Sequence, residues 1–300
     1  MYTVYVINLD RDTEKMTEFA RQFYLDKLKY VKFKACDAYS PCGDGDDSVG
    51  IQIDSACKSW LCSSSVIGCA RSHMTLWTQL SQNDEKYKII MEDDARFCPS
   101  SFCDAMDCIQ DILLDEKPVI ISFMCIGPFC RVGSRTTRQC TSGIQYVLTE
   151  SIFPLAATAY AINKSAACYL LQKMHNTVHY HIDFTIAQHV STTTLTYYTI
   201  EPTLVTTSST HSNIYDDKIK SSIGSHHTAS LFFGWNPNIM WLLNVPPWRF
   251  TSLYTVVLVL VLIILLISWL VSRSSGWWHQ WGVWFVIAII VIELVLFLSS

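Results

Sequence analysis

Three adjacent acidic residues, Glu92, Asp93 and Asp94, follow the largely apolar segment 87–91. This segment predicts a β-strand, and ligands of open α/β sheets bind outside the carboxyl ends of the strands. The three charges repel one another unless a cation neutralises them, and Mg²⁺ or Mn²⁺ takes such oxygen ligands, often together with substrate phosphates. Side chains two positions apart share one side of an extended chain. The pattern therefore predicts a divalent-cation site at Glu92 and Asp94, with a solvated acidic turn as the alternative.

Two polar residues of a nearby segment could serve the same site. Arg71 and His73 lie in the segment 67–77, about twenty residues before the acidic group. Apolar residues recur at helical spacing over 64–80, which predicts a helix with one buried face. An arginine there could pair with a phosphate through charge-assisted hydrogen bonds. For His73 taken alone, a helix histidine satisfied by a backbone carbonyl is the commoner outcome.

Strands and helices alternate along the first 174 residues. We expect strands at 3–8, 30–35, 87–91, 119–124 and 158–162, and helices that begin at Asp12 or Thr13, at Ser64, after Pro99 and at Ser165. The Gly- and Asp-rich segment 41–54 predicts a loop. Such alternation predicts an α/β fold in which helices cover both faces of a mostly parallel sheet.

The C-terminal part of the chain has a different composition. Of the 22 basic and 26 acidic residues, only three lie beyond residue 240. The segments 253–271 and 281–298 are apolar runs with tryptophans near their ends, and each is long enough to cross ~30 Å of hydrocarbon. We therefore predict a domain at 1–240, a membrane-proximal linker at 241–252, and a two-helix transmembrane hairpin at 253–271 and 281–298. A pair of buried core helices is the alternative.

Charge and cysteine content narrow the class of protein. The formal net charge is −4, and a slightly acidic domain is a poor partner for phosphate backbones, so we exclude nucleic acid. The N-terminus lacks the basic and apolar regions of a signal peptide, which predicts a cytosolic domain anchored by the hairpin. The 12 cysteines would then be mostly thiols. A disulfide-bearing lumenal domain is the alternative, and the glycosylation sequon at Asn163 could report on that choice.

Three segments together resemble glycosyltransferase family 25, which includes lipo-oligosaccharide galactosyltransferases and collagen galactosyltransferase domains. They are I-N-L-D-R at 7–11, G-C-A-R-S-H-M-T-L-W at 68–77 and I-I-M-E-D-D at 89–94. Weaker likenesses lie at 159–162, at 182–183 and at 212–214. The resemblance spans residues 3–215 and leaves out the two apolar runs.

The resemblance implies a glycosyltransferase A-type fold and transfer of a hexose, galactose or glucose, from a UDP-sugar to an acceptor hydroxyl with inversion. Glu92 and Asp94 would hold Mn²⁺ (or Mg²⁺) on the donor diphosphate. Asp183 would be the general base for the acceptor hydroxyl, with a helix N-cap as the alternative. The implied donor-binding residues are Asn8, Arg11, Arg71, His73 and Asp93. A membrane anchor suits an acceptor glycan carried on a lipid or a glycoprotein.

Weaker candidates lie among the histidines and arginines. His211 could complete the metal site, and a surface histidine is the equal alternative. We expect His179 and His181 to be structural. Three arginines in a Gly/Ser/Thr-rich stretch could form a mobile lid over phosphate, although a solvated basic loop is commoner; they are Arg131, Arg135 and Arg138. Glu293 falls in the second apolar run, where an acid is costly and usually paired or functional.

Two other functions compete with hexosyl transfer. A non-catalytic, membrane-anchored scaffold could have kept the transferase fold, but the intact acidic and helical motifs disfavour it. A metal-dependent nucleotidyl- or phosphotransferase also needs carboxylates at a strand end. The sequence has no Gly-x-x-x-x-Gly-Lys loop, which disfavours a kinase.

Overall fold

A computed structural model describes residues 1–207, apart from 39, 41, 44–49, 56, 126–132, 141, 152–156, 191–193 and the side chains of 60 and 61. Arg131, His211, the linker and both apolar runs lie outside the described residues. Within the part of the chain that is described, no helix is both long and apolar enough to cross a bilayer. The transmembrane hairpin therefore stays a prediction.

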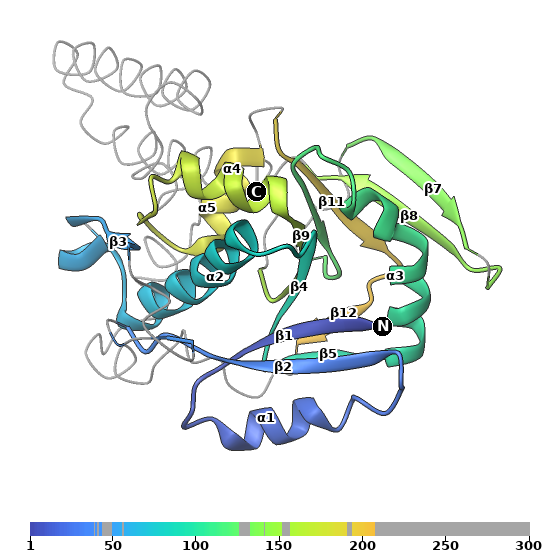
Figure 1. Cartoon of the computed structure of the whole chain (residues 1–300), viewed down its shortest axis with the longest axis horizontal. Coiled ribbons are helices and arrows are strands. Elements are labelled where there is room, and N and C mark those ends of the chain that lie inside the picture. Colours follow the sequence, from blue (N-terminus) through green and yellow to red (C-terminus); the bar gives the residue numbers. More distant parts are fainter. Residues whose placement is uncertain are drawn as a thin grey trace, which may run out of the picture. The chain divides into compact units, whose positions relative to one another are not determined.

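A central eight-stranded sheet has the strand order β2-β1-β4-β9-β6-β11-β8-β7 (Figure 1). Its strands are β1 (Tyr2–Asn8), β2 (Leu28–Lys34), β4 (Tyr87–Glu92), β6 (Val119–Ser122), β7 (Arg135–Gln139), β8 (Gln145–Glu150), β9 (Ala159–Asn163) and β11 (Thr196–Glu201). Two short pairs lie outside it, β3 (Gln52–Ile53) with β10 (Thr177–Val178) and β5 (Ala95–Phe97) with β12 (Val205–Thr207).

The sheet is mixed, although most of its strands run in one direction. β1 pairs in parallel with β2 and β4, and β6 pairs in parallel with β11. β9 lies antiparallel between β4 and β6, and β8 lies antiparallel between β11 and β7. The predicted α/β class with a mostly parallel sheet is confirmed, with β8 and β9 as strands of opposite direction that the apolar runs alone do not reveal.

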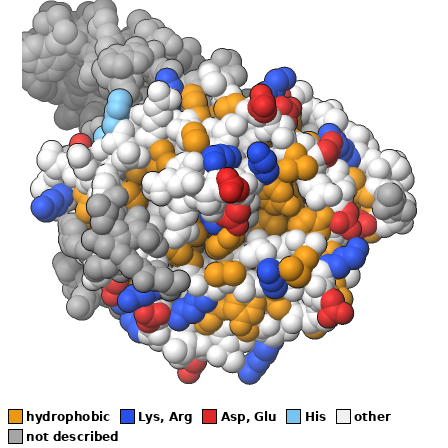
Figure 2. Space-filling model, viewed as in Figure 1, with side chains coloured by type: hydrophobic (Ala, Val, Ile, Leu, Met, Phe, Trp, Pro, Cys, Tyr) orange, Lys and Arg blue, Asp and Glu red, His pale blue; other side chains and the backbone are white. Residues whose placement is uncertain are grey.

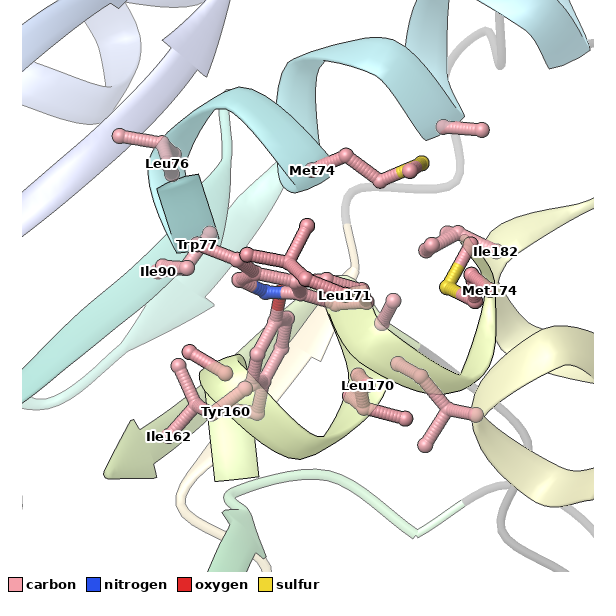
Figure 3. Packing of buried hydrophobic residues seen from close by; sticks show 14 of the residues in the cluster. Met74, Leu76, Trp77, Ile90, Tyr160, Ile162, Leu170, Leu171, Met174 and Ile182 are labelled. Carbon is pink, nitrogen blue, oxygen red and sulfur yellow. The ribbon is translucent and has the colours of Figure 1, made fainter. Parts of the chain in front are cut away.

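Five helices and one π-helical turn accompany the sheet in the described part of the chain. They are α1 (Thr13–Ala20), α2 (Ser64–Gln82), α3 (Pro99–Leu113), α4 (Lys164–Lys173), α5 (Ile182–Val190) and the turn at Cys57–Leu61. One core cluster joins a sheet face to α2, α4 and α5, and a second joins the other face to α1 and α3. The first core contains Trp77 beside Tyr160, close to Leu171 (Figure 3). Helices therefore cover both faces, as predicted.

The helix α2 begins where the sequence predicts. Ser63 is its N-cap, and the Ser63 hydroxyl accepts a hydrogen bond from the Val66 amide at 3.3 Å. Such a cap satisfies one of the amides that have no partner at a helix start. Every residue of α2 from Ala70 to Trp77 is buried, so the helix is enclosed on all sides there and not on one face alone. Packing therefore fixes the side chains that α2 presents to the carboxyl end of β4.

Disulfide bonds contradict the expectation of mostly free thiols. Three described pairs are bonded, Cys36–Cys42, Cys57–Cys62 and Cys108–Cys140, and Cys125 is bonded as well. Their Cα–Cα distances of 4.3, 4.6 and 5.4 Å lie near or within the usual range for a bridge. Cys69, Cys98, Cys103 and Cys168 are free. Spacing in the sequence did not disclose this pairing, because it depends on which loops the fold brings together.

The sequon asparagine is a structural residue. Asn163 is 1 % exposed and is the N-cap of α4. Its Oδ1 accepts hydrogen bonds from the amides of Ala166 (2.9 Å) and Val119 (3.0 Å). Its Nδ2 donates to the carbonyls of Asp115 (3.0 Å) and Lys117 (2.6 Å). Since both amide hydrogens are engaged and buried, the folded domain closes this sequon to glycan attachment.

Replacing Asn163 should therefore destabilise the domain. We expect Asn163→Ala to lower the free energy of unfolding by about 2 kcal/mol, because it leaves several buried backbone groups without partners. Urea denaturation followed by circular dichroism measures this. The exposed polar residue Gln82 at the end of α2 is the control, and an effect of Asn163→Ala no larger than that of Gln82→Ala would contradict the structural role.

Candidate functional site

The acidic group lies where β1 and β4 end side by side. Ile7 of β1 is the register partner of Glu92, so Asn8 and Asp93 are the next residues on the two neighbouring strands. The Asn8 Nδ2 donates to Asp93 Oδ2 at 2.7 Å and to the Asp12 carbonyl at 3.0 Å. Asn8 is 1 % exposed and Asp93 is 9 % exposed. The strand pairing thus places Asn8 to orient the Asp93 carboxylate.

A chain of side-chain contacts joins two of the sequence motifs, at 68–77 and 159–162, to Glu92 in a third. The Trp77 Nε1–H donates to the Tyr160 hydroxyl at 2.9 Å. The same hydroxyl lies 2.8 Å from His73 Nδ1, and His73 Nε2 lies 3.5 Å from Glu92 Oε1. Trp77 and His73 are one turn apart on α2, and Tyr160 comes from β9 next to β4. The expected backbone-carbonyl partner for His73 is therefore wrong, since its two nitrogens face Tyr160 and Glu92.

His73 is neutral at physiological pH. Burial lowers its pKa to about 4, because a charged imidazole loses its hydration inside the domain. The contact between His73 and Glu92 is consequently no ion pair near pH 7, despite its 3.5 Å distance. A neutral ring has one protonated nitrogen, and a tyrosine hydroxyl can donate to or accept from the other. Tyr160 can accordingly form a hydrogen bond with His73 Nδ1 in either tautomer of the ring.

The two predicted metal ligands both resist ionisation. Burial, followed by the negative charge of Asp183, raises the pKa of Glu92 to about 7. Burial and the charge of Glu92 raise the pKa of Asp94 to about 6. The Asp94 Oδ1 is buried and has no hydrogen-bond partner among the described residues. A buried carboxylate oxygen without a donor fits a cation ligand, because a divalent ion would supply the missing positive charge.

Arg71 is held by a loop. Its Nη1 donates to the carbonyls of Ala38 (2.6 Å) and Ser40 (2.9 Å), and the residue is 7 % exposed. The Cys36–Cys42 disulfide closes this loop. Arg71 therefore fastens the loop to α2, and its predicted contact with a donor phosphate stays a prediction.

Arg11 pairs with an acidic residue outside the acidic group. It forms an exposed ion pair with Asp37, and its side chain is 60 % exposed. Such a pair contributes little to stability in water. The arginine is therefore free to turn toward a bound ligand, and its donor role also stays a prediction.

Asp183 comes close to the acidic group although it is 91 positions away from Glu92 in the chain. It lies in the first turn of α5, which begins at Ile182, so it is not the N-cap residue. Its Oδ1 accepts from the Ala157 amide at 2.9 Å, and its Oδ2 lies 3.7 Å from His181 Nδ1. Its charge is the largest electrostatic contribution to the raised pKa of Glu92. The fold thus adds a fourth carboxylate to the three of the acidic group.

Other predicted residues lie elsewhere. His179 is close to Asp54 at 3.7 Å with a half-exposed ring. The loop predicted for the arginines, either as a lid or as a solvated basic loop, is wrong for the two described ones. Arg135 and Arg138 belong to strand β7, where they pair with Glu201 (2.9 Å) and Asp111 (2.6 Å). An edge strand fixes their backbone, and acidic partners already occupy their guanidinium groups.

Cys69 is a residue of the site that was missed in the sequence. Its Sγ lies 3.8 Å from Glu92 Oε1, on the same face of α2 as His73. The i, i+4 spacing of Cys69 and His73 was the available signal, because such residues are neighbours on a helix surface.

One face of the molecule carries side chains of both charges. On the face shown in Figure 2, acidic and basic side chains are interspersed with apolar ones.

The raised pKa values predict how stability depends on pH. The stabilisation that comes from protonated Glu92 is fully present below pH 4.5, the pKa of this group in the unfolded chain. It is lost as the pH rises through about 7, the pKa of Glu92 in the folded chain. Metal-free protein should therefore lose on the order of 2 kcal/mol of unfolding free energy between pH 5 and pH 8 from this group. Urea denaturation of the chain in chelator measures the loss.

The variant Glu92→Gln isolates this contribution, because its amide does not titrate. We expect the stability of Glu92→Gln to fall less over the same pH range. Equal pH slopes for the variant and the native chain would show that Glu92 ionises normally.

The family comparison agrees with the motifs. A family model described as "Glycosyltransferase family 25 (LPS biosynthesis protein)" matches residues 1–186. This range includes β1, α2, β4, β9 and Asp183, hence every side chain of the site described above. No curated protein matches the chain. The resemblance seen in the three motifs is thereby confirmed.

Proposed function

Because this glycosyltransferase belongs to glycosyltransferase family 25, we propose that it transfers a hexose, galactose or glucose, from a UDP-sugar to an acceptor hydroxyl with inversion. Its family makes it an enzyme that binds a sugar donor and an acceptor. The observation that supports the finer proposal is the group of buried and partly buried carboxylates at the end of β4, next to Asp183. Such a group suits a substrate that brings a metal ion and a diphosphate.

Glu92 and Asp94 would hold a divalent cation, Mn²⁺ or Mg²⁺. The raised pKa values of both residues and the unpartnered Asp94 Oδ1 support this assignment. A cation bound there would neutralise charge on the departing diphosphate. Asn8 holds the Asp93 carboxylate at 2.7 Å, so Asp93 is placed to accept hydrogen bonds from the donor ribose or sugar. His211 remains a further candidate ligand.

Asp183 would act as the general base. In an inverting transfer, the acceptor oxygen forms its bond to the anomeric carbon as the bond to the diphosphate oxygen breaks. The hydroxyl proton moves to the Asp183 carboxylate in the same step, and no covalent intermediate with the enzyme is needed. The Ala157 amide, 2.9 Å from Asp183 Oδ1, fixes the orientation of that carboxylate.

The donor diphosphate would be bound by arginines of two segments. The partners of Arg71 in the loop are neutral carbonyls. Arg71 would turn one N–H toward a phosphate oxygen while it keeps its hydrogen bond to Ala38. Arg11 would close over the nucleotide from the end of β1. His73 would contribute through Glu92, which it faces at 3.5 Å.

The compartment and the anchor are also part of the proposal. Disulfides persist in oxidising compartments and are reduced in the cytosol. The three bridges therefore support the lumenal alternative over the cytosolic domain predicted from the N-terminus. We retain the C-terminal hairpin as the membrane anchor, which would bring the domain to acceptors carried on lipids or glycoproteins. Alkylation of thiols before and after reduction, read by mass spectrometry on native protein, tests the bridges.

Donor hydrolysis tests the enzymatic proposal. The full chain, purified in detergent, is incubated with UDP-, GDP- and CMP-sugars with and without Mn²⁺. We expect metal-dependent release of UDP from UDP-galactose or UDP-glucose. Folded protein that neither hydrolyses nor binds any sugar nucleotide would favour the scaffold function. Turnover of free nucleoside triphosphates instead would favour a nucleotidyl- or phosphotransferase.

A further inference from the structure

Three side chains of different chemistry converge beside the acidic group. The ligand atoms of Cys69, His73 and Glu92 all lie within 4.8 Å of one another. Cys69 Sγ is 3.8 Å and His73 Nε2 is 3.5 Å from the same oxygen, Glu92 Oε1. Cys69 is a free thiol. We propose that Cys69, His73 and Glu92 form a second cation site, for a thiolate-binding ion such as Zn²⁺.

The distances suit a tetrahedral ion. With usual bond lengths, tetrahedral Zn²⁺ holds a nitrogen and an oxygen ligand ~3.4 Å apart and a sulfur and an oxygen ligand ~3.6 Å apart. The observed separations of 3.5 and 3.8 Å differ from these by only a few tenths of an ångström. The ligand atoms of Cys69 and His73 lie within 4.8 Å of each other, so small side-chain rotations would let all three residues enclose an ion, and the fourth position stays open to water or a ligand.

The surroundings also suit a metal ligand. A metal-bound histidine usually donates its other ring N–H to a fixed acceptor, which sets the orientation of the ring. Tyr160, 2.8 Å from His73 Nδ1, is such an acceptor, and Trp77 holds it in place at 2.9 Å. His73 and Tyr160 are fully buried. The hydrogen bonds that would orient a metal-bound His73 are thus already present.

The ligand set distinguishes this site from the proposed donor-metal site. Thiolate and imidazole select Zn²⁺ and related ions, whereas Mn²⁺ and Mg²⁺ prefer carboxylates and phosphates. Both sites use Glu92. Occupancy by Zn²⁺ takes the Glu92 carboxylate away from the donor-metal site, and it should inhibit transfer.

Cobalt substitution tests the binding. Co²⁺ bound to a thiolate gives sulfur-to-metal charge-transfer absorption, and tetrahedral Co²⁺ gives intense visible bands. The metal-free full chain, with its disulfides intact, is titrated with Co²⁺ and then with Zn²⁺. We expect one Co²⁺ to produce both sets of bands and Zn²⁺ to abolish them.

Matched variants locate the site. Cys69→Ser should abolish the charge-transfer band, because it replaces only the sulfur. Glu92→Gln should keep the band and weaken Co²⁺ binding at least about 10-fold. The exposed free cysteines provide controls, since Cys98→Ser and Cys168→Ser should bind as the native chain does. Absence of the band from the native chain, or its persistence in Cys69→Ser, would overturn the proposed site.

Inhibition is tested separately, because this consequence rests on the proposed function. For each protein, we compare the rate of Mn²⁺-dependent UDP release with and without Zn²⁺. The factor by which Zn²⁺ lowers this rate should be at least about 10-fold larger for the native chain than for Cys69→Ser. Equal sensitivity of the two proteins would overturn the inhibitory role. If neither protein releases UDP, the proposed function fails, while the cobalt spectra still decide whether the ion site exists.

Discussion

Asp94→Asn should abolish metal-dependent turnover and leave the fold intact. The substitution keeps the shape of the side chain but removes the anionic oxygen that lacks a hydrogen-bond partner in the described structure. Charge stabilisation of this kind typically accounts for about 100-fold or more in rate. We therefore expect at least ~100-fold slower UDP release in saturating donor and Mn²⁺.

The stability of Asp94→Asn distinguishes a chemical from a structural effect. Burial and the neighbouring Glu92 already disfavour the charged form of Asp94, as its pKa of about 6 indicates. A neutral amide relieves this repulsion, so the melting temperature of the metal-free variant should be unchanged or higher near pH 7. The exposed Asp26, before β2, provides a control, and Asp26→Asn should retain full activity. Undiminished activity in Asp94→Asn would remove Asp94 from the metal site.

Gly68→Ala should destabilise the domain strongly, although alanine is normally the better helix former. A Cβ on Gly68 would lie 2.4 Å from the Cys36 carbonyl oxygen and 2.9 Å from the Ala38 amide nitrogen, which are both backbone atoms. The Cys36–Cys42 disulfide and two hydrogen bonds hold the loop 36–42 in place. The Cys36 amide donates to the Ser72 hydroxyl (2.9 Å), and Arg71 donates to the Ala38 carbonyl (2.6 Å).

The loop consequently cannot move aside without breaking contacts to α2. We expect Gly68→Ala to lower the free energy of unfolding by about 3 kcal/mol, as overpacking of a tight contact does. Without the clash, the same change in a helix would raise stability by up to ~1 kcal/mol, so the sign of the effect is decisive. Urea denaturation measures it, with exposed Ser64→Ala on the same helix as the control. A stabilised Gly68→Ala would show that helix and loop are not in tight contact.

The local elements could be predicted because their signals are short in range. The apolar runs that became β1 and β4 and the helical period that became α2 lie within one or two residues of the predicted bounds. Three adjacent acids at a strand end also predicted the place of the site. The family was evident for the same reason, since its three motifs are each contiguous.

Strand direction and pairing required the folded chain. An apolar run such as β9 looks alike in parallel and antiparallel positions, and only its pairing with β4 and β6 fixes its direction. The hairpin of β7 and β8 carries few apolar residues on its outer strand, so its arginines were taken for a loop. Disulfide pairing likewise depends on which loops meet.

The sequence by itself determined that this protein is an α/β glycosyltransferase with a carboxylate site after its β4 strand. Only the tertiary structure decided how that site is built. His73 meets Tyr160 across 87 positions and Asn8 meets Asp93 across 85, and Cys69 turns toward Glu92 from a different element. Contacts over such separations arise from the packing of helices on the sheet, and no local pattern in the chain encodes them.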